Sequence, residues 1–290
     1  MTCRTLGAVG YYPRMTRPFI SFLTDFGPDS AAAICRGVMI SIAPDAQIVD
    51  ISHSIRKYQI RDGAFLLWCA VPWMPVGVLV AVVDPGVGTA RRPIGILTGR
   101  GDMLIGPDNG LLLPAAERLG GVSEVRELAN RELMLPRTTS TFHGRDIFAP
   151  IGAHLAMGRR FDEIGPTVET DSLVSLVFPA PVARAGGLDT TIIYIDSFGN
   201  LRLGGDPADL AAAIGELTPG RPLTVRFAAD GDSPEIVERT TWEQTFGAKE
   251  FGAPLLYEDS FDRLAYADNQ GNVAGRLGLK VERAVRIDPA

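Results

Sequence analysis

The sequence predicts an α/β N-terminal domain with a mainly parallel sheet, followed by a smaller domain made mostly of β-strands. Strand and helix patterns alternate over the first two thirds of the chain, and short strand-like runs dominate after about residue 175. The 290 residues exceed the usual size of one domain, and 46% apolar residues suffice for a core in each of two. We therefore expect two domains.

The N-terminal elements follow one another as strand and helix. Residues 29–42 predict a helix that Asp29 or Ser30 caps and Pro44 stops. The run GVLVAVVD (77–84) is uninterrupted and rich in β-branched residues, which favours a strand buried on both faces of a parallel sheet. The other expected elements are strands at 18–27, 47–52, 94–99 and 102–107, and helices at 61–71 and 111–119.

A Pro/Gly/Ala stretch, FPAPVARAGG, separates the two domains and shows no periodicity. We expect a disordered leader or a misassigned start ahead of Met15. The expected division is a leader at 1–17, an α/β domain at 18–178, a linker at 179–187 and a mostly-β domain at 188–290. In the second domain we expect strands at 190–196, 222–227, 235–242, 254–259, 263–268 and 284–288, and helices at 206–213 and 271–279.

Composition and charge exclude several classes of protein. Three widely spaced cysteines without a C-x-x-C pair argue against a disulfide framework, a structural zinc site and secretion. A net charge of −6 argues against a nucleic-acid partner, because phosphate binding needs a basic face. The longest apolar run, 76–83, is too short to span a bilayer, and no signal peptide precedes the first strand. We expect a cytoplasmic protein.

Acidic residues end several apolar runs. Asp25, Asp84 and Asp196 each terminate one, and Asp108 follows another closely. Ligands of open parallel sheets bind beyond the carboxyl ends of the strands, so these acids are candidate ligand contacts. The alternative is that an aspartate after a strand serves only as a turn residue or helix cap.

Two other kinds of site are weighed and rejected. The string DPGVGT lacks the Lys-Ser/Thr ending of a phosphate loop and the spacing G-x-G-x-x-G. His143, Asp146 and His154 have no tight metal-ligand spacing, so we expect no metal.

Two strings carry polar residues that core packing does not explain. VVDPGVGTARR contains Asp84 and Arg91, and STFHGRDIFAP contains His143. An acid, a cation and a histidine are suited to moving a proton from a water molecule. The plainer interpretations are a surface cation after a turn, for which Arg92 is the better candidate, and a histidine satisfied within the core.

The motifs FLTDFG, AVVDPGVGTARR, GPDNGLL, STFHGRDIFAP and IDSFGNL occur in this order. Over residues 18–288 the chain thereby resembles the S-adenosyl-L-methionine (SAM) hydroxide adenosyltransferases, relatives of the fluorinase and chlorinase. The resemblance implies hydrolysis of SAM to adenosine and L-methionine without a metal or organic cofactor. It also implies an α/β N-terminal domain, a β-barrel-like C-terminal domain, and a homotrimer with sites between neighbouring subunits.

The family's water-activating triad falls on Asp84, Arg91 and His143. The halogenating relatives have tyrosine in place of this acid, and the fluorinase has a halide-binding serine just after the histidine position, where this chain has Gly144. An aspartate beside the nucleophile would repel a halide anion, so the resemblance favours a hydrolase over a halogenase. A SAM sensor without catalysis is a further alternative.

The resemblance also implies a set of substrate-binding side chains. They are Asp25 for the ribose hydroxyls, Asp196 for the methionine ammonium, Asn200 for adenine, Phe198 and Phe246 for stacking on the purine, Ser260 for the amino-acid end, and Asn269 with Gln270 for the adenine edge. Two departures affect these contacts. IDSFGN has one residue fewer between acid and Phe than the fluorinase, and RLGGD (202–206) replaces an expected Thr-Asn run.

Overall fold

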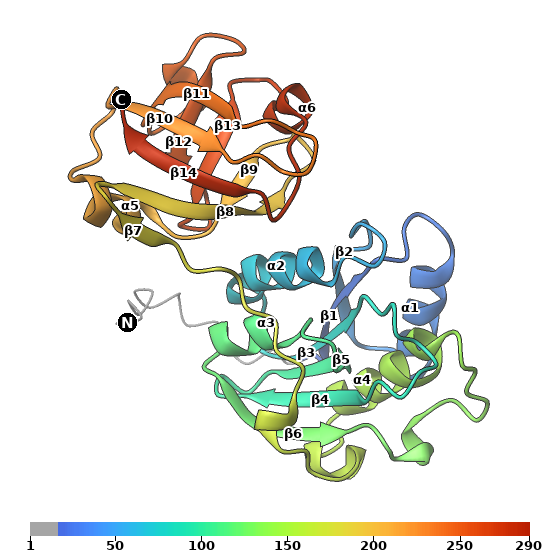
Figure 1. Cartoon of the computed structure of the whole chain (residues 1–290). Helices are drawn as coiled ribbons and strands as arrows, with labels where there is room; N and C mark the ends of the chain where they lie inside the picture. Colours follow the sequence, from blue (N-terminus) through green and yellow to red (C-terminus); the bar gives the residue numbers. More distant parts are fainter. Residues whose placement is uncertain (1–16) are drawn as a thin grey trace. The chain divides into compact units, whose positions relative to one another are not determined.

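A computed structural model describes residues 17–290 and divides them into two compact units, with the boundary between Leu176 and Val177 (Figure 1). Except for residue 17, the leader expected at 1–17 lies outside the described residues. The predicted fold class is confirmed: the first unit is α/β with a mostly parallel sheet, and the second is a nearly closed antiparallel barrel.

The N-terminal unit is built on a sheet with strand order β2-β1-β3-β5-β4-β6. The first four strands in this order run parallel, and β4 is antiparallel to both β5 and β6. Its helices and strands are β1 Phe19–Thr24, α1 Ala31–Ile42, β2 Gln47–Ser52, α2 Ile60–Ala70, β3 Val78–Val82, β4 Pro93–Thr98, β5 Met103–Pro107, α3 Leu113–Arg118, β6 Val122–Glu127 and α4 Ala149–Ala156.

Helices cover both faces of this sheet, as the fully buried strands β1 and β3 require (Figure 1). Every residue of β3 is buried, as its uninterrupted apolar run predicts. Ile20 and Phe22 of β1 join the core cluster that contains α1 and α4. Leu23 points to the other face, where Gly63 of α2 comes so close that a Cβ atom would lie 3.7 Å from the Leu23 side chain. The carboxyl ends of β1, β3 and β5 therefore meet at one edge between these layers.

The C-terminal unit is a sheet with strand order β11-β10-β14-β8-β9-β13-β12. An isolated bridge between Trp242, just after β11, and Leu256 of β12 brings the two ends of this order together, which makes the sheet barrel-like. Its elements are β7 Val182–Arg184, β8 Gly187–Ile195, β9 Leu201–Leu203, α5 Pro207–Ile214, β10 Pro222–Phe227, β11 Ile236–Thr241, β12 Pro254–Glu258, β13 Leu264–Asp268, α6 Val273–Leu277 and β14 Ala284–Pro289.

The segment 179–187, expected to be a linker, instead contains β7, which pairs with β8 in an antiparallel hairpin. Ala185 (φ 45°) and Gly186 (φ 73°) form the turn, and two consecutive positive φ angles are the geometry of tight hairpins. All three residues of β7 are exposed, so no alternating apolar pattern marks the strand in the sequence.

No helix among residues 17–290 has both the length and the apolar character needed to cross a membrane.

Candidate active site

Asp84 and Arg91 form a buried ion pair just after β3. Arg91 Nε donates to Asp84 Oδ1 at 3.1 Å, and a second guanidinium nitrogen donates to Oδ2. The two side chains are 5% and 7% exposed. A bidentate pair of this kind fixes the plane of the carboxylate. The residue before Asp84 is also held by a neighbouring loop, because Asn109 Nδ2 donates to the carbonyl of Val83 at 2.9 Å.

A glycine allows the second loop of the site to approach the first. Gly88 has φ +78°, and a Cβ atom there would lie 2.3 Å from the carbonyl oxygen of Ser140. Only a residue without a side chain permits this backbone contact. The contact brings the loop before His143 against the loop that carries Arg91.

His143 completes the cluster, with its Nδ1 3.2 Å from an Arg91 terminal nitrogen. It precedes a π-helical turn at Gly144–Phe148, which continues into α4. Burial lowers the pKa of His143 below 6.5, and the positive charge of Arg91 lowers it further against the opposing effect of Asp84. The neutral imidazole therefore accepts the Arg91 N–H through Nδ1.

Arg91 keeps one buried nitrogen, Nη1, without a hydrogen-bond partner among the described residues. Its guanidinium also lies 5.4 Å from the centre of the Phe148 ring. A buried donor without a partner is costly, so this nitrogen is a candidate contact for a water molecule or a substrate oxygen.

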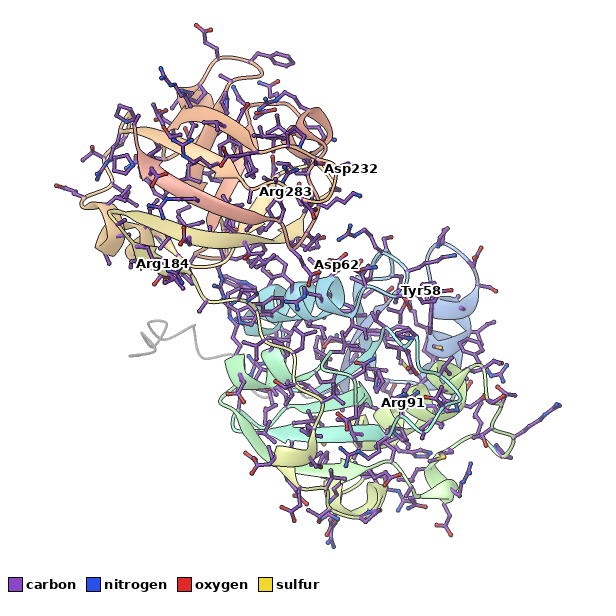
Figure 2. The ribbon with its side chains drawn as sticks, in the orientation of Figure 1. Tyr58, Asp62, Arg91, Arg184, Asp232 and Arg283 are labelled. Atoms are coloured by element: carbon purple, nitrogen blue, oxygen red, sulfur yellow. The ribbon has the colours of Figure 1, made fainter. Side chains whose placement is uncertain are left out.

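Asp25 lies at the end of β1, the strand beside β3, so the topology brings it to the same edge as Asp84. Its backbone N–H donates to the carbonyl of Val82 at 3.3 Å. Asp25 Oδ2 accepts the backbone N–H of Tyr58 at 3.0 Å. Tyr58 has φ 68° and an exposed ring; Figure 2 labels it together with Arg91.

Two other acids of the N-terminal unit, one after β5 and one in the π-helical turn, have structural partners. Asp108 accepts two bonds from Arg92 and the backbone N–H of Val174. Asp146 accepts from the backbone and hydroxyl of Thr139 and from Arg145. Asp108 thus serves as a turn anchor, the alternative considered for acids after strands. Among residues 17–290 no group of three His, Cys, Asp or Glu side chains is placed to hold a metal ion.

The C-terminal unit contains a pocket of about 720 Å³. Six of the predicted substrate-binding residues line it: Asp196, Phe198, Asn200, Phe246, Ser260 and Gln270. Phe198 is among the most exposed large apolar side chains of the described chain. A solvent-facing aromatic ring at a pocket mouth is suited to stacking on a flat ligand.

Asn269 does not line the pocket. It is buried, its Nδ2 donates to the carbonyl of Lys249 at 2.7 Å, and its backbone N–H donates to Ala253. The side-chain amide nitrogen is thereby committed to holding the loop next to Gln270.

Asp196 is held by neighbours on its own turn. Oδ1 accepts the backbone N–H groups of Phe198 and Asn200, and Oδ2 accepts from Asn200 Nδ2 at 3.0 Å. Arg202 reaches the same Oδ2 at 3.3 Å and pairs with the buried Asp259 at 2.6 Å. Three lining residues of the pocket therefore form a fixed arrangement of two carboxylates around one guanidinium.

Sequence reasoning missed several residues of both units. Arg202 and Tyr257 line the pocket and are hydrogen-bonded to each other at 3.3 Å. The only signal was RLGGD, which stood out as a departure from the expected motif. Tyr58 acts through its backbone N–H, which residue type does not reveal, and Asn109 acts through its side-chain amide on the carbonyl of Val83.

The α/β unit contains a buried cluster of a carboxylate, a guanidinium and an imidazole, and the barrel-like unit contains a pocket with acidic residues. Together these features define a two-domain enzyme that acts on small molecules. The chain belongs to the SAM hydroxide adenosyltransferase family. The N-terminal domain of that family matches residues 20–165 and the C-terminal domain matches residues 190–286. The resemblance seen in the motifs is confirmed.

Several relatives match over nearly their whole length. An (R)-S-adenosyl-L-methionine hydrolase of Salinispora tropica is 41% identical, covering 93% of this chain and 97% of the relative. A hydrolase of the same name from Thermus thermophilus is 35% identical, covering 92% and 98%. A fluorinase of an Actinoplanes species is 31% identical, covering 96% and 100%.

Among solved structures, an uncharacterized conserved protein from Thermotoga maritima superposes with a TM-score of 0.85 at 31% identity. The match covers 93% of this chain and 99% of that one.

Proposed function

We propose that this protein hydrolyses S-adenosyl-L-methionine to adenosine and L-methionine. The names of the relatives at 41% and 35% identity support this substrate and reaction. The observation that carries the proposal is the buried Asp84–Arg91 pair with His143 beside it. Such a cluster is suited to accepting a proton from water and has no obvious use in a protein that only binds SAM.

In the proposed reaction, a water oxygen attacks C5′ of the ribose in line with the sulfonium. The C5′–O bond forms as the C5′–S bond breaks, and the bonding electrons leave with sulfur to give neutral methionine. Asp84 accepts the proton of the attacking water and later releases it to solvent, Arg91 holds the carboxylate, and His143 accepts an N–H of Arg91 and holds the guanidinium in place. The leaving group is neutral, so the reaction needs no general acid and no cofactor. Holding water close to C5′ supplies much of the rate.

The remaining contacts follow the side chains that line the edge and the pocket. Asp25 has acceptor capacity left after its bond to Tyr58 and would accept both ribose hydroxyls. Phe198 and Phe246 would stack on adenine, Asn200 and Gln270 would meet its edge, and Asp196 and Ser260 would meet the methionine end. Asn269 would offer adenine its amide oxygen, because its side-chain nitrogen and both of its backbone groups are engaged.

We further propose a cytoplasmic homotrimer with sites between neighbouring subunits. The support is the family to which the chain belongs. Light scattering on purified protein tests the oligomeric state, since a monomer or dimer would contradict the homotrimer.

A halogenase on the same scaffold is the competing function, because a fluorinase is 31% identical. Asp84 disfavours it, since a carboxylate within the site repels a halide anion. The test is chromatography of chelator-treated protein with SAM, with and without excess chloride. Equal amounts of adenosine and methionine, unaffected by chloride, are expected. A 5′-chloro nucleoside would indicate a halogenase, and binding without product would indicate a sensor.

A further inference from the structure

His53 lies on the loop after β2 and reaches the last residue of β1. Its ring Nδ1 is 2.9 Å from Thr24 Oγ1. Thr24 is fully buried, whereas the His53 side chain is 17% exposed. A buried hydroxyl needs a partner, and this imidazole provides one.

The same two residues also hold the backbone that directly follows Asp25. Thr24 Oγ1 accepts the backbone N–H of Phe26 at 3.2 Å, and the carbonyl of His53 accepts the backbone N–H of Gly27 at 2.7 Å. The turn that carries Asp25 is therefore fastened to the β2 loop through one side-chain contact and one backbone contact.

The imidazole itself is fixed by its surroundings. Its ring packs edge-on against Phe22, with ring centres 4.8 Å apart. Nε2 lies 3.2 Å from Asp50 Oδ1, within ion-pair distance but without an aligned hydrogen bond. Asp50 in turn accepts from Arg36 of α1 at 2.9 Å. These contacts come from β1, β2 and α1, so the position of the ring is set by the regular elements of the N-terminal unit.

We propose that His53 is a positioning residue for Asp25 and thereby determines how strongly the site discriminates ribose from 2′-deoxyribose. The inference rests on the proposed function, in which Asp25 accepts the ribose hydroxyls. A carboxylate accepts hydrogen bonds from two adjacent ribose hydroxyls only when both of its oxygens face them. Rotation of the turn that carries Asp25 would therefore weaken the discrimination between ribose and 2′-deoxyribose. Adenine and methionine contacts come from other residues and are not affected.

The experiment compares binding of adenosine and 2′-deoxyadenosine by calorimetry. His53→Phe keeps a ring against Phe22 but removes the partner of Thr24. His53→Asn places an amide atom where Nδ1 lies. The matched control is His154→Gln, because His154 is also half-buried but lies on α4.

The wild-type chain is expected to prefer adenosine by roughly tenfold or more, the value of a lost hydrogen bond to a charged group. His53→Phe should lose most of this preference, while His53→Asn and His154→Gln retain it. A role in folding alone would weaken both nucleosides equally and leave their ratio unchanged. The inference would be overturned if His53→Phe kept the wild-type ratio of the two dissociation constants, or if the wild type bound adenosine and 2′-deoxyadenosine equally well. SAM turnover by the same preparations reports separately on the proposed function.

Discussion

Arg91 binds Asp84 through two nitrogens, and one of these nitrogens also lies 3.2 Å from His143. The guanidinium thus connects the acid at the end of β3 with the histidine before the π-helical turn. This single connection joins two motifs that are 52 residues apart in the sequence.

Asp84→Asn removes the proton acceptor while keeping the shape of the side chain. Turnover of SAM should fall by about 10²–10⁴-fold, the range for general-base assistance, with little change in the dissociation constant of SAM. Steady-state kinetics and calorimetry measure the two quantities. Asp108→Asn is the matched control, because Asp108 also pairs with an arginine, Arg92. The control should lose stability but retain turnover, and equal losses in both variants would remove Asp84 from the mechanism.

Arg91→Lys keeps the positive charge but cannot contact both Asp84 oxygens and His143 with a planar group. Turnover should fall by roughly tenfold or more, the value of a lost charged hydrogen bond, with the fold intact by circular dichroism. Wild-type turnover in this variant would show that charge alone suffices.

The lowered pKa of His143 predicts an acidic limb in the pH–rate profile. The neutral ring is the form that accepts from Arg91, so kcat should be constant at and above pH 6.5 and fall only as the pH approaches the lower pKa of folded His143. The group binds fewer protons folded than unfolded, so its contribution to stability is complete above pH 6.5. That contribution is lost as the pH falls from 6.5 to the lower pKa of the folded state. His143→Gln should remove the limb; a profile that keeps the same limb assigns it to another group.

Gly144→Ala should destabilise the N-terminal unit. A Cβ atom at this buried position would lie 2.8 Å from Phe26 Cζ. Overpacking of this kind costs about 1–3 kcal/mol, measured by urea unfolding. Gly37→Ala is the control, because a Cβ there has open space within α1 and should stabilise by about 0.5–1 kcal/mol. Phe26→Leu should recover part of the Gly144→Ala loss, and the absence of any coupling would contradict the contact.

The sequence predicted β1 to β5 of the N-terminal sheet because their signals are local, whereas β6 was missed because its residues, VSEVRE, are mostly polar and only one of them is buried. The run 77–84 is apolar throughout, and β3 is buried throughout. The hairpin of β7 was missed because its three residues are exposed and carry no periodicity. Turn chemistry at Ala185 and Gly186 created that hairpin, and alanine is not a residue that marks a positive φ.

The candidate site divides in the same way. Long motifs identified Asp84, Arg91 and His143, and the structure brings all three together. The contacts that position them depend on backbone approach, such as Gly88 against Ser140. The partners of Asp196 and Asn269 likewise depend on turns that no spacing rule predicts.

The most direct test of the central claim is hydrolysis of SAM in water enriched in oxygen-18, followed by mass spectrometry of both products. Attack of water at C5′ predicts the heavy oxygen in the 5′-hydroxyl of adenosine and unlabelled methionine. Unlabelled adenosine, or cleavage on the amino-acid side of sulfur, would contradict the proposed role of Asp84, Arg91 and His143.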